Sequence, residues 1–465
     1  MLEKDIYFVK QLIFKKIKPK SLSEKFHKIL FSKIENLILN DKELIKIYNH
    51  NKEVSIDDFA KIYITFVNKK IKNLLTKFKK NKINIIFISE KVYFNQIRIN
   101  NFLNSKFIDT ASISLNNKNI HHNGFKINLS LSIFEIFILL SKSKNFKVFS
   151  QGWLFRYHQS YLIDSFKNSN IHIVEMMDLN SFWFPKYKNK KIERSMKIVW
   201  GHDAKLNHEL QLFSENYLYN NCDKVLFPGS INHVEDLKLN NKYRFEKYFE
   251  FGSYPQKKYF AKPVIKKKYK PENINLVFAG GIVPIEKRRT KKIYADAQFV
   301  STAKIILSQN YNLTVFNNPL QLKEKYYKTV YKPHYKLMNR YKNNYKFLKG
   351  FVGKEATKRL SSYDLGLMIY DFNKTTLIGE NHFKNMIPTK FFLYMEACLP
   401  VLVSSRWVTV SQIVQRYNLG CVVSEQNIYN LKNIIKKIDL AQLKKNVSSY
   451  RNLFKDFSQF EFLLN

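Results

Sequence analysis

The sequence is poor in cysteine. Cys222, Cys398 and Cys421 are its three cysteines in 465 residues, and they show neither close pairing nor the spacing of metal ligands. Disulfide frameworks and zinc sites need several cysteines or histidines at short, recurring distances. The sequence therefore argues against both, and it predicts a protein of a reducing, cytosolic compartment.

Long apolar runs are also absent. The most apolar segment, residues 129–141, is shorter than the roughly 20 residues that span a bilayer, and it carries Glu135. The chain starts Met1-Leu-Glu-Lys-Asp, without the basic start and apolar core of a signal peptide. We therefore expect a buried strand or helix at 129–141 and a cytoplasmic location.

Glycine and proline are scarce, with 12 and 11 residues respectively, whereas 45% of the residues are apolar and 15% are aromatic. Disordered chains lack apolar and aromatic residues, so this composition predicts a large packed interior. The chain has 465 residues, which exceeds what one hydrophobic core usually fills. We expect two principal domains and an appendage.

Acidic residues are few beside the basic ones: 37 Asp and Glu oppose 79 Lys and Arg, and the formal net charge is +42. Such a charge attracts anionic partners over long distances. Three partners fit, namely nucleic acid, an anionic membrane surface and a phosphorylated substrate. A composition rich in Lys, Asn, Ile, Phe and Tyr is also typical of an AT-rich genome, which does not explain the shortage of Asp and Glu.

A basic amphipathic helix is predicted over residues 59–78. Ser55 and Asp58 have the spacing of a capping box before it. Lysines fill almost all of one helix face, and the other face has apolar residues every three or four positions, namely Phe59, Tyr63, Phe66, Val67, Leu74, Leu75 and Phe78. Two interpretations stay open: the helix packs on the next domain with solvated lysines, or it lies on an anionic membrane.

From Ile83 onward, short β-branched segments alternate with helical ones, and a second set of this kind begins at Ile274. Between them, residues 251–271 are basic and rich in proline, which is typical of a linker. Alternating strands and helices predict parallel sheets with right-handed crossovers. We therefore expect an α/β protein with a helical N-terminal extension (1–80), two Rossmann-like domains (81–260 and 261–440) and a helical C-terminal tail (441–465).

Glycines follow the first predicted strand of the second domain. Gly280 and Gly281 lack Cβ atoms, so backbone N–H groups there are able to approach a phosphate closely. Lys287, Arg288 and Arg289 come next in the same loop and have the charge to neutralise a diphosphate. We expect Gly280 and Gly281 with either Lys287 or Arg288 to bind such a group.

The segment 388–403 predicts a helix that begins at Thr389, ends at Pro400 and leads directly into a β-branched strand. Lys390 lies in its first turn, where its charge adds to the positive end of the helix dipole. A lysine at this end is locally unfavourable. Its position therefore favours a role toward an anionic ligand.

This segment resembles the donor-binding helix of group 1 glycosyltransferases, which often contains Pro-x-Lys-x-x-Glu-Tyr-Met-Ala-x-Gly-x-Pro-Val. The chain keeps its Pro, Lys, Tyr, Met and Pro-Val, but it has Leu393 in place of the Glu and Cys398 in place of the Gly. Phe347-Leu-Lys-Gly350 and Leu419-Gly-Cys-Val lie before and after it in the family's order. The resemblance implies the GT-B fold, in which two Rossmann-like domains face each other across a cleft.

The resemblance also implies a site. The C-terminal domain would bind a nucleotide-sugar donor through Gly280, Gly281, Lys287 or Arg288, Lys390 and Tyr394, and the N-terminal domain would bind the acceptor. The family's Glu binds the ribose of the donor, which Leu393 is unable to do. Two alternatives stay open for the nearby Glu396: it replaces the missing carboxylate, or it belongs to a structural pair.

For acid–base chemistry the N-terminal domain offers Asp178, at the predicted end of a strand, and His202, within a cluster with Asp203, His208 and Glu209. No Asp-x-Asp occurs, the pair with which metal-dependent glycosyltransferases hold a divalent cation. We therefore expect no metal and no cofactor, because the nucleotide-sugar is a substrate.

The expected function is transfer of a sugar from a nucleotide-sugar donor to a glycan or lipid-linked acceptor of the cell envelope. The expected setting is the cytoplasm, with peripheral contact to the inner membrane face. Two alternatives remain. One is an inactive GT-B-like partner subunit, which Leu393 and Cys398 allow. The other is a nucleic-acid-binding protein, which the even spread of lysines along the chain disfavours.

Overall fold

The computed structural model divides the chain into two compact units. The N-terminal unit holds the described residues up to Phe249, and the C-terminal unit holds those from Glu250 onward together with 229 and 230. The structure describes residues 46–47, 50, 53–89, 94–115, 124–142, 146–151, 170–174, 221–227, 229–230, 248–265, 269–282, 298–319, 327–371 and 380–464. The boundary thus falls before the predicted one at 260.

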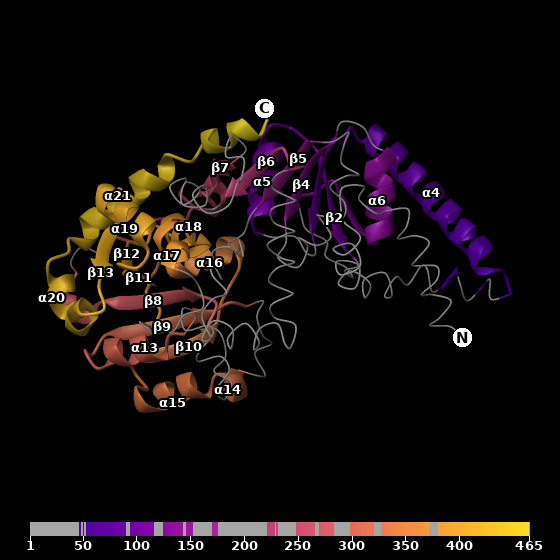
Figure 1. Ribbon diagram of the computed structural model, residues 1–465. Coiled ribbons are helices and arrows are strands. Elements are labelled where there is room, and N and C mark those ends of the chain that lie inside the picture. The colour runs from indigo at the N-terminus through magenta and orange to yellow at the C-terminus, as the bar shows by residue number, and fades with distance from the viewer. Residues whose placement is uncertain are drawn as a thin grey trace. The chain divides into compact units, whose positions relative to one another are not determined.

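The N-terminal unit is built on a seven-stranded sheet with the order β3-β2-β1-β4-β5-β6-β7 (Figure 1). Adjacent strands from β3 to β6 pair in parallel. The chain order reverses between β1 and β4, as it does in a Rossmann fold. The strands are β1 (Ile85–Ser89), β2 (Thr110–Leu115), β3 (Ile127–Leu131), β4 (Lys147–Gln151), β5 (Asn170–Val174), β6 (Lys224–Phe227) and β7 (Tyr248–Glu250).

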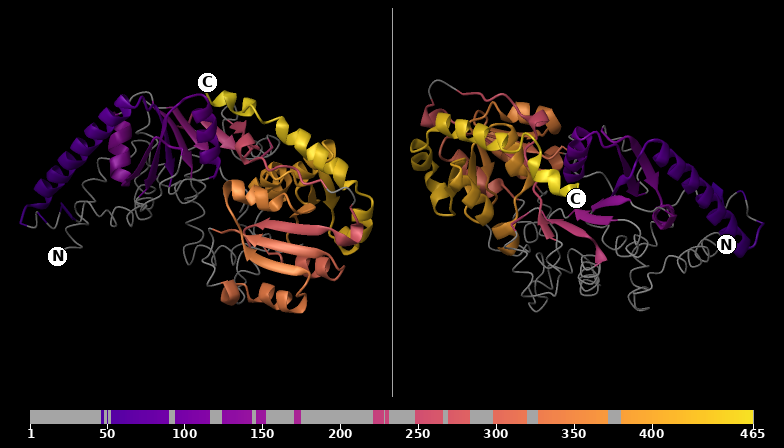
Figure 2. Two further views of the ribbon diagram at one scale, coloured as in Figure 1. Left: turned by 180° about the vertical axis from the view of Figure 1, so that it is seen from behind. Right: turned by 90° about the horizontal axis from the view of Figure 1, so that it is seen from above.

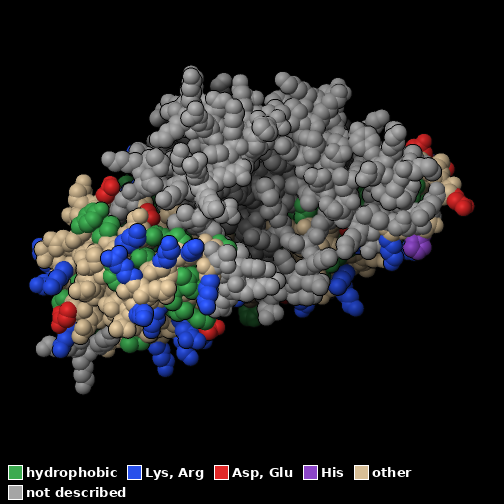
Figure 3. Space-filling model, turned by 90° about the horizontal axis from the view of Figure 1, so that it is seen from below, with side chains coloured by type: hydrophobic (Ala, Val, Ile, Leu, Met, Phe, Trp, Pro, Cys, Tyr) green, Lys and Arg blue, Asp and Glu red, His purple; other side chains and the backbone are tan. Residues whose placement is uncertain are grey.

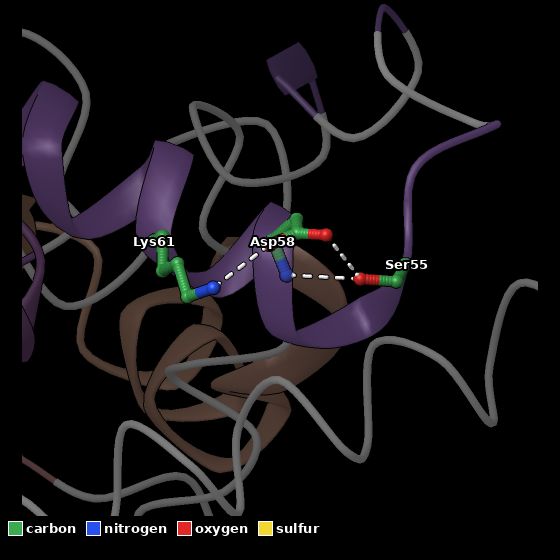
Figure 4. Close-up of polar contacts among 3 residues, drawn as sticks. All are labelled: Ser55, Asp58 and Lys61. Carbon is green, nitrogen blue, oxygen red and sulfur yellow. Dashed lines mark hydrogen bonds and ion pairs between the residues drawn. The ribbon is translucent and has the colours of Figure 1, made fainter.

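The basic helix predicted at 59–78 is α4 (Ile56–Lys80). Ser55 is its N-cap: the Ser55 hydroxyl accepts a hydrogen bond from the Asp58 amide at 3.2 Å and donates one to the Asp58 carboxylate at 2.7 Å (Figure 4). Lys61 pairs with the same carboxylate at 2.9 Å. Ser55 is thus confirmed as the cap of this helix, and Asp58 contacts it through the hydroxyl.

Helix α4 lies beside α6 (Ile133–Lys142) in both Figures 1 and 2. The Tyr63 and Phe134 rings stack with centroids 5.8 Å apart, and Lys70 pairs with Glu135 at 2.6 Å. Glu135 also accepts the amide hydrogen bond of Ser132 at the start of α6. The apolar face of α4 is thus used inside the unit, as the packing interpretation predicts, although Phe66 is 38% exposed.

The C-terminal unit contains a six-stranded sheet with the order β10-β9-β8-β11-β12-β13, and its strands pair in parallel. This order again reverses once, between β8 and β11, so the unit is a second Rossmann-like fold. The strands are β8 (Asn275–Gly280), β9 (Asn312–Asn317), β10 (Tyr345–Lys349), β11 (Leu365–Met368), β12 (Val401–Ser404) and β13 (Gly420–Val423).

Helices pack on both faces of this sheet. On one face Phe278, Leu313 and Leu367 form a core with Ile306 and Leu337 from two helices, and on the other face the Tyr394 ring packs against Gly366. The helices of the two units not yet given are α5 (Phe94–Ser105), α13 (Val300–Leu307), α14 (Tyr327–Val330), α15 (Lys332–Arg340), α16 (Gly353–Leu360), α17 (Glu380–Asn385), α18 (Thr389–Glu396), α19 (Val408–Arg416), α20 (Leu431–Lys436) and α21 (Leu440–Asn452), with short 3-10 turns at Lys257–Tyr259, Pro271–Asn273, Asn427–Asn430 and Ser458–Leu463.

The predicted linker and tail are both packed parts of the C-terminal unit. Phe251 is fully buried, and the Tyr254 ring stacks on Phe454 with centroids 5.2 Å apart. From α21, the Arg451 guanidinium donates hydrogen bonds to the carbonyls of Ala261 and Glu396 at 2.9 and 2.8 Å. These contacts explain why the unit begins earlier and ends later than the sequence predicts. In the described part of the chain, no helix combines the length and the apolar character needed to cross a membrane.

Candidate functional site

The candidate site lies where the strand order of the C-terminal sheet reverses. Strands β8 and β11 are neighbours in the sheet and run in parallel, so their carboxyl ends lie side by side. Gly280 ends β8, and Tyr370 and Asp371 follow β11. In open α/β sheets, ligands bind in the crevice at the carboxyl ends of the two strands that flank this reversal.

Helix α18 begins at the same place. Pro388 is its N-cap, with φ of −61°, and Thr389 and Lys390 form the first turn. The first N–H groups of a helix have no partner within the helix, and the helix dipole makes this end positive. The predicted start at Thr389 is confirmed. The site therefore combines a helix N-terminus with a lysine.

Lys390 reaches across the end of β8 because Gly280 has no side chain. A Cβ at Gly280 would lie 2.7 Å from Lys390 Cε and 3.0 Å from Nζ. The ammonium group lies 3.6 Å from the centroid of the Phe278 ring and 4.2 Å from that of the Tyr370 ring. It also donates a hydrogen bond to the Tyr370 hydroxyl at 3.1 Å.

Burial lowers the pKa of the Lys390 ammonium well below its usual range. Desolvation disfavours the charged form of a lysine, whereas a nearby anion restores it. No carboxylate pairs with Lys390 among the residues that the structure describes. An anionic ligand at this place would therefore favour the charged form of Lys390, which no described carboxylate neutralises.

The turn after β8 is held by β9. The Ile282 amide donates a hydrogen bond to the Asn317 side chain at 2.9 Å, and the Asn318 amide donates one to the Gly280 carbonyl at 3.2 Å. Gly281, between them, is half-buried. The structure thus brings Gly280, Gly281 and Lys390 together. The predicted Lys287 and Arg288 lie outside the described residues.

Tyr394 has a different place from the one expected of a donor ligand. Its hydroxyl accepts a hydrogen bond from the Ala279 amide at 2.8 Å and donates one to the Leu367 carbonyl at 3.1 Å. The side chain is completely buried, which raises the pKa of the phenol. Tyr394 therefore fixes α18 to β8 and β11, and its contacts position the helix that carries Lys390.

Two alternatives were open for Glu396, a ribose-binding carboxylate or a member of a structural pair. Its contacts match the structural pair. Glu396 is 1% exposed, and its carboxylate accepts the amide hydrogen bond of Gln256 at 2.8 Å. Gln256 is itself fully buried in the segment that precedes β8. Leu393, at the family's Glu position, is half-buried. Cys398 has φ of +55°, the left-handed conformation that explains the family's glycine.

The acid–base candidates of the N-terminal domain, Asp178 and His202, lie outside the described residues. In the described part of that unit, the strand order reverses between β1 and β4, whose carboxyl ends are Ser89 and Gln151. The Ser89 hydroxyl is buried and has no hydrogen-bond partner among the residues that the structure describes. Sequence reasoning missed this place because a lone serine after an apolar run has no distinguishing pattern.

Phe278 and Tyr370 are further site residues that the sequence did not indicate. Both lie in or next to apolar strands, where aromatic residues are ordinary core positions. Across the described ranges, no three His, Cys, Asp or Glu side chains gather as ligands for a metal ion. Among the described residues, the site's positive groups include the Lys390 ammonium and the N-terminus of α18.

Comparison with known proteins decides the fold. Over 82% of its length the chain matches the sucrose-phosphate synthase of Thermosynechococcus elongatus (TM-score 0.51, 12% identity, 97% of that chain). It matches equally a UDP-forming α,α-trehalose-phosphate synthase of Burkholderia vietnamiensis (82% of this chain, 98% of that chain, TM-score 0.51, 8% identity). This is the GT-B glycosyltransferase fold.

A third GT-B likeness is to the N-terminal domain of a Candida albicans trehalose-6-phosphate phosphatase (TM-score 0.52, 10% identity, 82% of this chain and 95% of that chain). Residues 310–463 match the family model of the glucosyltransferase 3-like C-terminal domain. No curated protein matches the sequence. The GT-B prediction is thereby confirmed, and the C-terminal unit is similar to a glucosyltransferase domain over residues 310–463.

Proposed function

We propose that this GT-B protein transfers a sugar from a nucleoside-diphosphate sugar, and that the donor diphosphate binds at the carboxyl ends of β8 and β11. The observation that carries the proposal is the Lys390 ammonium, which crosses Gly280 at the N-terminus of α18. A cation and a helix N-terminus together attract phosphate groups. They also stabilise the charge that the leaving diphosphate gains as its bond to the sugar breaks.

Further parts of the proposal extend this site. The amides around Gly280 and Gly281 approach the phosphates, and Lys287 or Arg288 supplies a second cation, so that no metal is needed. Tyr394 and Glu396 support α18. The N-terminal unit binds the acceptor, with Asp178 or His202 as its base. UDP is the first nucleotide to test, because the trehalose-phosphate synthase with this fold is UDP-forming.

The acceptor that we propose is a glycan or lipid-linked sugar of the cell envelope, made at the cytoplasmic membrane face. What supports a membrane partner is charge: Lys69, Lys72 and Lys77 on α4 are exposed, beside Ile62 and Phe66, which are 37% and 38% exposed. The C-terminal unit also carries Lys and Arg side chains among hydrophobic ones, at the left of Figure 3. No specific nucleic-acid partner is proposed.

A second candidate function is that of a GT-B-like subunit without transfer activity. One observation favours it: the family's ribose-binding carboxylate is replaced by Leu393, and the carboxylate of Glu396 is bonded to Gln256. Such a subunit would bind a nucleotide weakly or not at all and would not turn over any donor.

Nucleotide binding tests the proposal. We expect UDP or GDP to raise the melting temperature of the wild type in the presence of EDTA, and we expect Lys390→Ala to weaken that nucleotide's affinity by about ten- to a hundred-fold, as loss of a charged hydrogen-bond partner does. Lys432→Ala is the matched control, because Lys432 is exposed on α20 of the same unit. The nucleotide affinity of the Lys432→Ala variant should equal that of the wild type.

The outcomes separate the candidates. Donor hydrolysis or transfer by the wild type, lost in Lys390→Ala, supports the enzyme. Nucleotide binding without turnover of any donor in a substrate panel supports the inactive subunit. Equal nucleotide affinity in the Lys390→Ala and Lys432→Ala variants would show that the donor site is elsewhere.

A further inference from the structure

Two aromatic rings enclose the ammonium of Lys390. The Phe278 and Tyr370 rings meet edge to face with centroids 5.2 Å apart, and Lys390 Nζ lies within 4.2 Å of both centroids. An ammonium over an aromatic face is attracted by the ring quadrupole, most strongly where water is excluded. The two rings therefore partly replace the hydration that the ammonium loses.

The Tyr370 hydroxyl adds a directed contact. It lies 3.1 Å from Lys390 Nζ and accepts a hydrogen bond from it. A hydrogen bond to the charged form of a group favours that form. Burial acts on Lys390 in the opposite direction, so the hydroxyl and the rings oppose the loss of its proton.

Tyr370 is itself fixed in place by α13. The Thr302 hydroxyl donates a hydrogen bond to the Tyr370 carbonyl at 3.1 Å, and the next residue, Asp371, accepts hydrogen bonds from the amides of Ser301 and Thr302 at the start of α13. The Asp371 amide donates to the Gln298 carbonyl at 2.8 Å. The backbone that carries Tyr370 is thus hydrogen-bonded on both sides.

These contacts have a chemical use at a diphosphate site. A lysine that stays charged and stationary before the ligand binds stabilises the leaving group without reorganisation, which is the condition for strong electrostatic stabilisation. A flexible surface lysine would instead lose side-chain entropy on each binding event. Gly280 contributes by leaving the space through which the side chain passes.

We propose that Tyr370 is a positioning residue of the donor site: with Phe278 it holds the Lys390 ammonium charged and aimed at the diphosphate. This inference rests on the proposed function for its catalytic meaning. The effect of Tyr370 on the pKa of Lys390 is measurable whether or not a nucleotide binds.

Tyr370→Phe is the direct test, because it keeps the ring and removes only the acceptor. Acetic anhydride labels a lysine in its neutral form, so the labelling of Lys390, followed by peptide mass spectrometry over a pH series, reports its pKa. We expect the rise in labelling to occur at a lower pH in Tyr370→Phe than in the wild type, because the charged form has lost a partner. Tyr417→Phe, a matched change at a residue 39% exposed, should leave the curve unchanged.

The second measurement is the affinity for UDP and GDP over the same pH series. Binding needs the charged lysine, so it weakens as pH rises through the Lys390 pKa. In Tyr370→Phe this weakening should start at lower pH, and the affinity at alkaline pH should be about ten-fold below that of the wild type, whereas mildly acidic pH should restore most of it. A purely structural role would lower the affinity equally at every pH.

The results distinguish this inference from the proposed function. Identical labelling curves and identical pH dependence in Tyr370→Phe and the wild type would overturn the positioning role, even if the wild type binds nucleotide well. A shifted labelling curve in a protein that binds neither UDP nor GDP would support the control of Lys390 by Tyr370 and would overturn the donor site.

Discussion

Gly280 and Lys390 share one small volume at the end of β8. A methyl group on residue 280 would overlap the last carbon of the lysine side chain, 2.7 Å from where a Cβ would be. The overlapped atom is the end of a flexible chain, so this overlap is relieved by moving Lys390, but Gly280 also has φ of +158°, which residues with a side chain rarely adopt. Replacement of this glycine is therefore expected both to displace the lysine and to strain the backbone.

We accordingly expect Gly280→Ala to weaken UDP or GDP binding by about ten-fold, because the ammonium group is displaced from the helix N-terminus. Calorimetric titration measures the affinity, and thermal unfolding should show a melting temperature below that of the wild type, because alanine is strained at this φ. The double variant with Lys390→Ala is the control. The double variant should have the same affinity as Lys390→Ala alone. If instead the two losses of affinity multiply, Gly280 acts independently of the lysine.

At the scale of single residues, the sequence indicated part of the candidate site. Gly280, Gly281 and Lys390 stood out because glycines after a strand and a lysine in a first helical turn are unusual for their local structure. Phe278 and Tyr370 did not, because their special role depends on a tertiary contact with residue 390. Glu396 was left open for the same reason: its partner, Gln256, is 140 positions away.

Helix α18 is the element on which the site depends, and one hydroxyl attaches it to the sheet. Tyr394 binds the Ala279 amide of β8 and the Leu367 carbonyl of β11, and its ring lies where Gly366 leaves room, 3.0 Å from a Cβ at that position. The position of Lys390 relative to Gly280 therefore depends on Tyr394.

Tyr394→Phe should lower the free energy of unfolding by about 1–3 kcal/mol, because the buried Ala279 amide loses its acceptor. Chemical denaturation measures this. Tyr311→Phe is the matched control. Tyr311 is 2% exposed, and its hydroxyl has no hydrogen-bond partner in the described structure. Removal of this hydroxyl should therefore leave the free energy of unfolding unchanged. Equal effects of the two changes would contradict the role given to the Tyr394 hydroxyl.

Among the elements, the sequence predicted those with a clear hydrophobic period, including α4, β8 and α18. It missed β2, whose sequence Thr-Ala-Ser-Ile-Ser-Leu is half hydroxyl residues. Thr110, Ser112 and Ser114 are nevertheless buried, and the Ser114 hydroxyl donates to the Leu129 carbonyl at 3.2 Å. Hydroxyls whose hydrogen bonds are satisfied within the sheet are compatible with a buried strand, and no sequence pattern reveals those partners.

At the scale of the whole molecule, charge is the dominant property. The formal net charge is +42, and many of the lysines of the described part are exposed, among them Lys69, Lys72 and Lys77 on α4. Exposed cations bind anionic surfaces in a salt-dependent way. Because the apolar face of α4 packs on α6, contact with a membrane through this helix would use its lysine face.

We expect the protein to sediment with vesicles that contain phosphatidylserine, but not with neutral vesicles, and to be released by high salt. Changing Lys69, Lys72 and Lys77 to Glu should reduce this binding by about a hundred-fold or more, at about 1 kcal/mol for each basic residue. Changing Lys332, Lys336 and Arg340 to Glu is the matched control, because these exposed cations of α15 alter the net charge equally. Equal losses in both variants would argue against a specific role of α4.

The contacts of α21 have a consequence for biosynthesis. Arg451 binds the carbonyls of Ala261 and Glu396, and Lys444 binds those of Val264 and Tyr363 at 2.7 and 3.0 Å. A ribosome makes the chain from its N-terminus, so these two cations emerge after the segments that they join. The surroundings of α18 are therefore complete only after α21 has been translated.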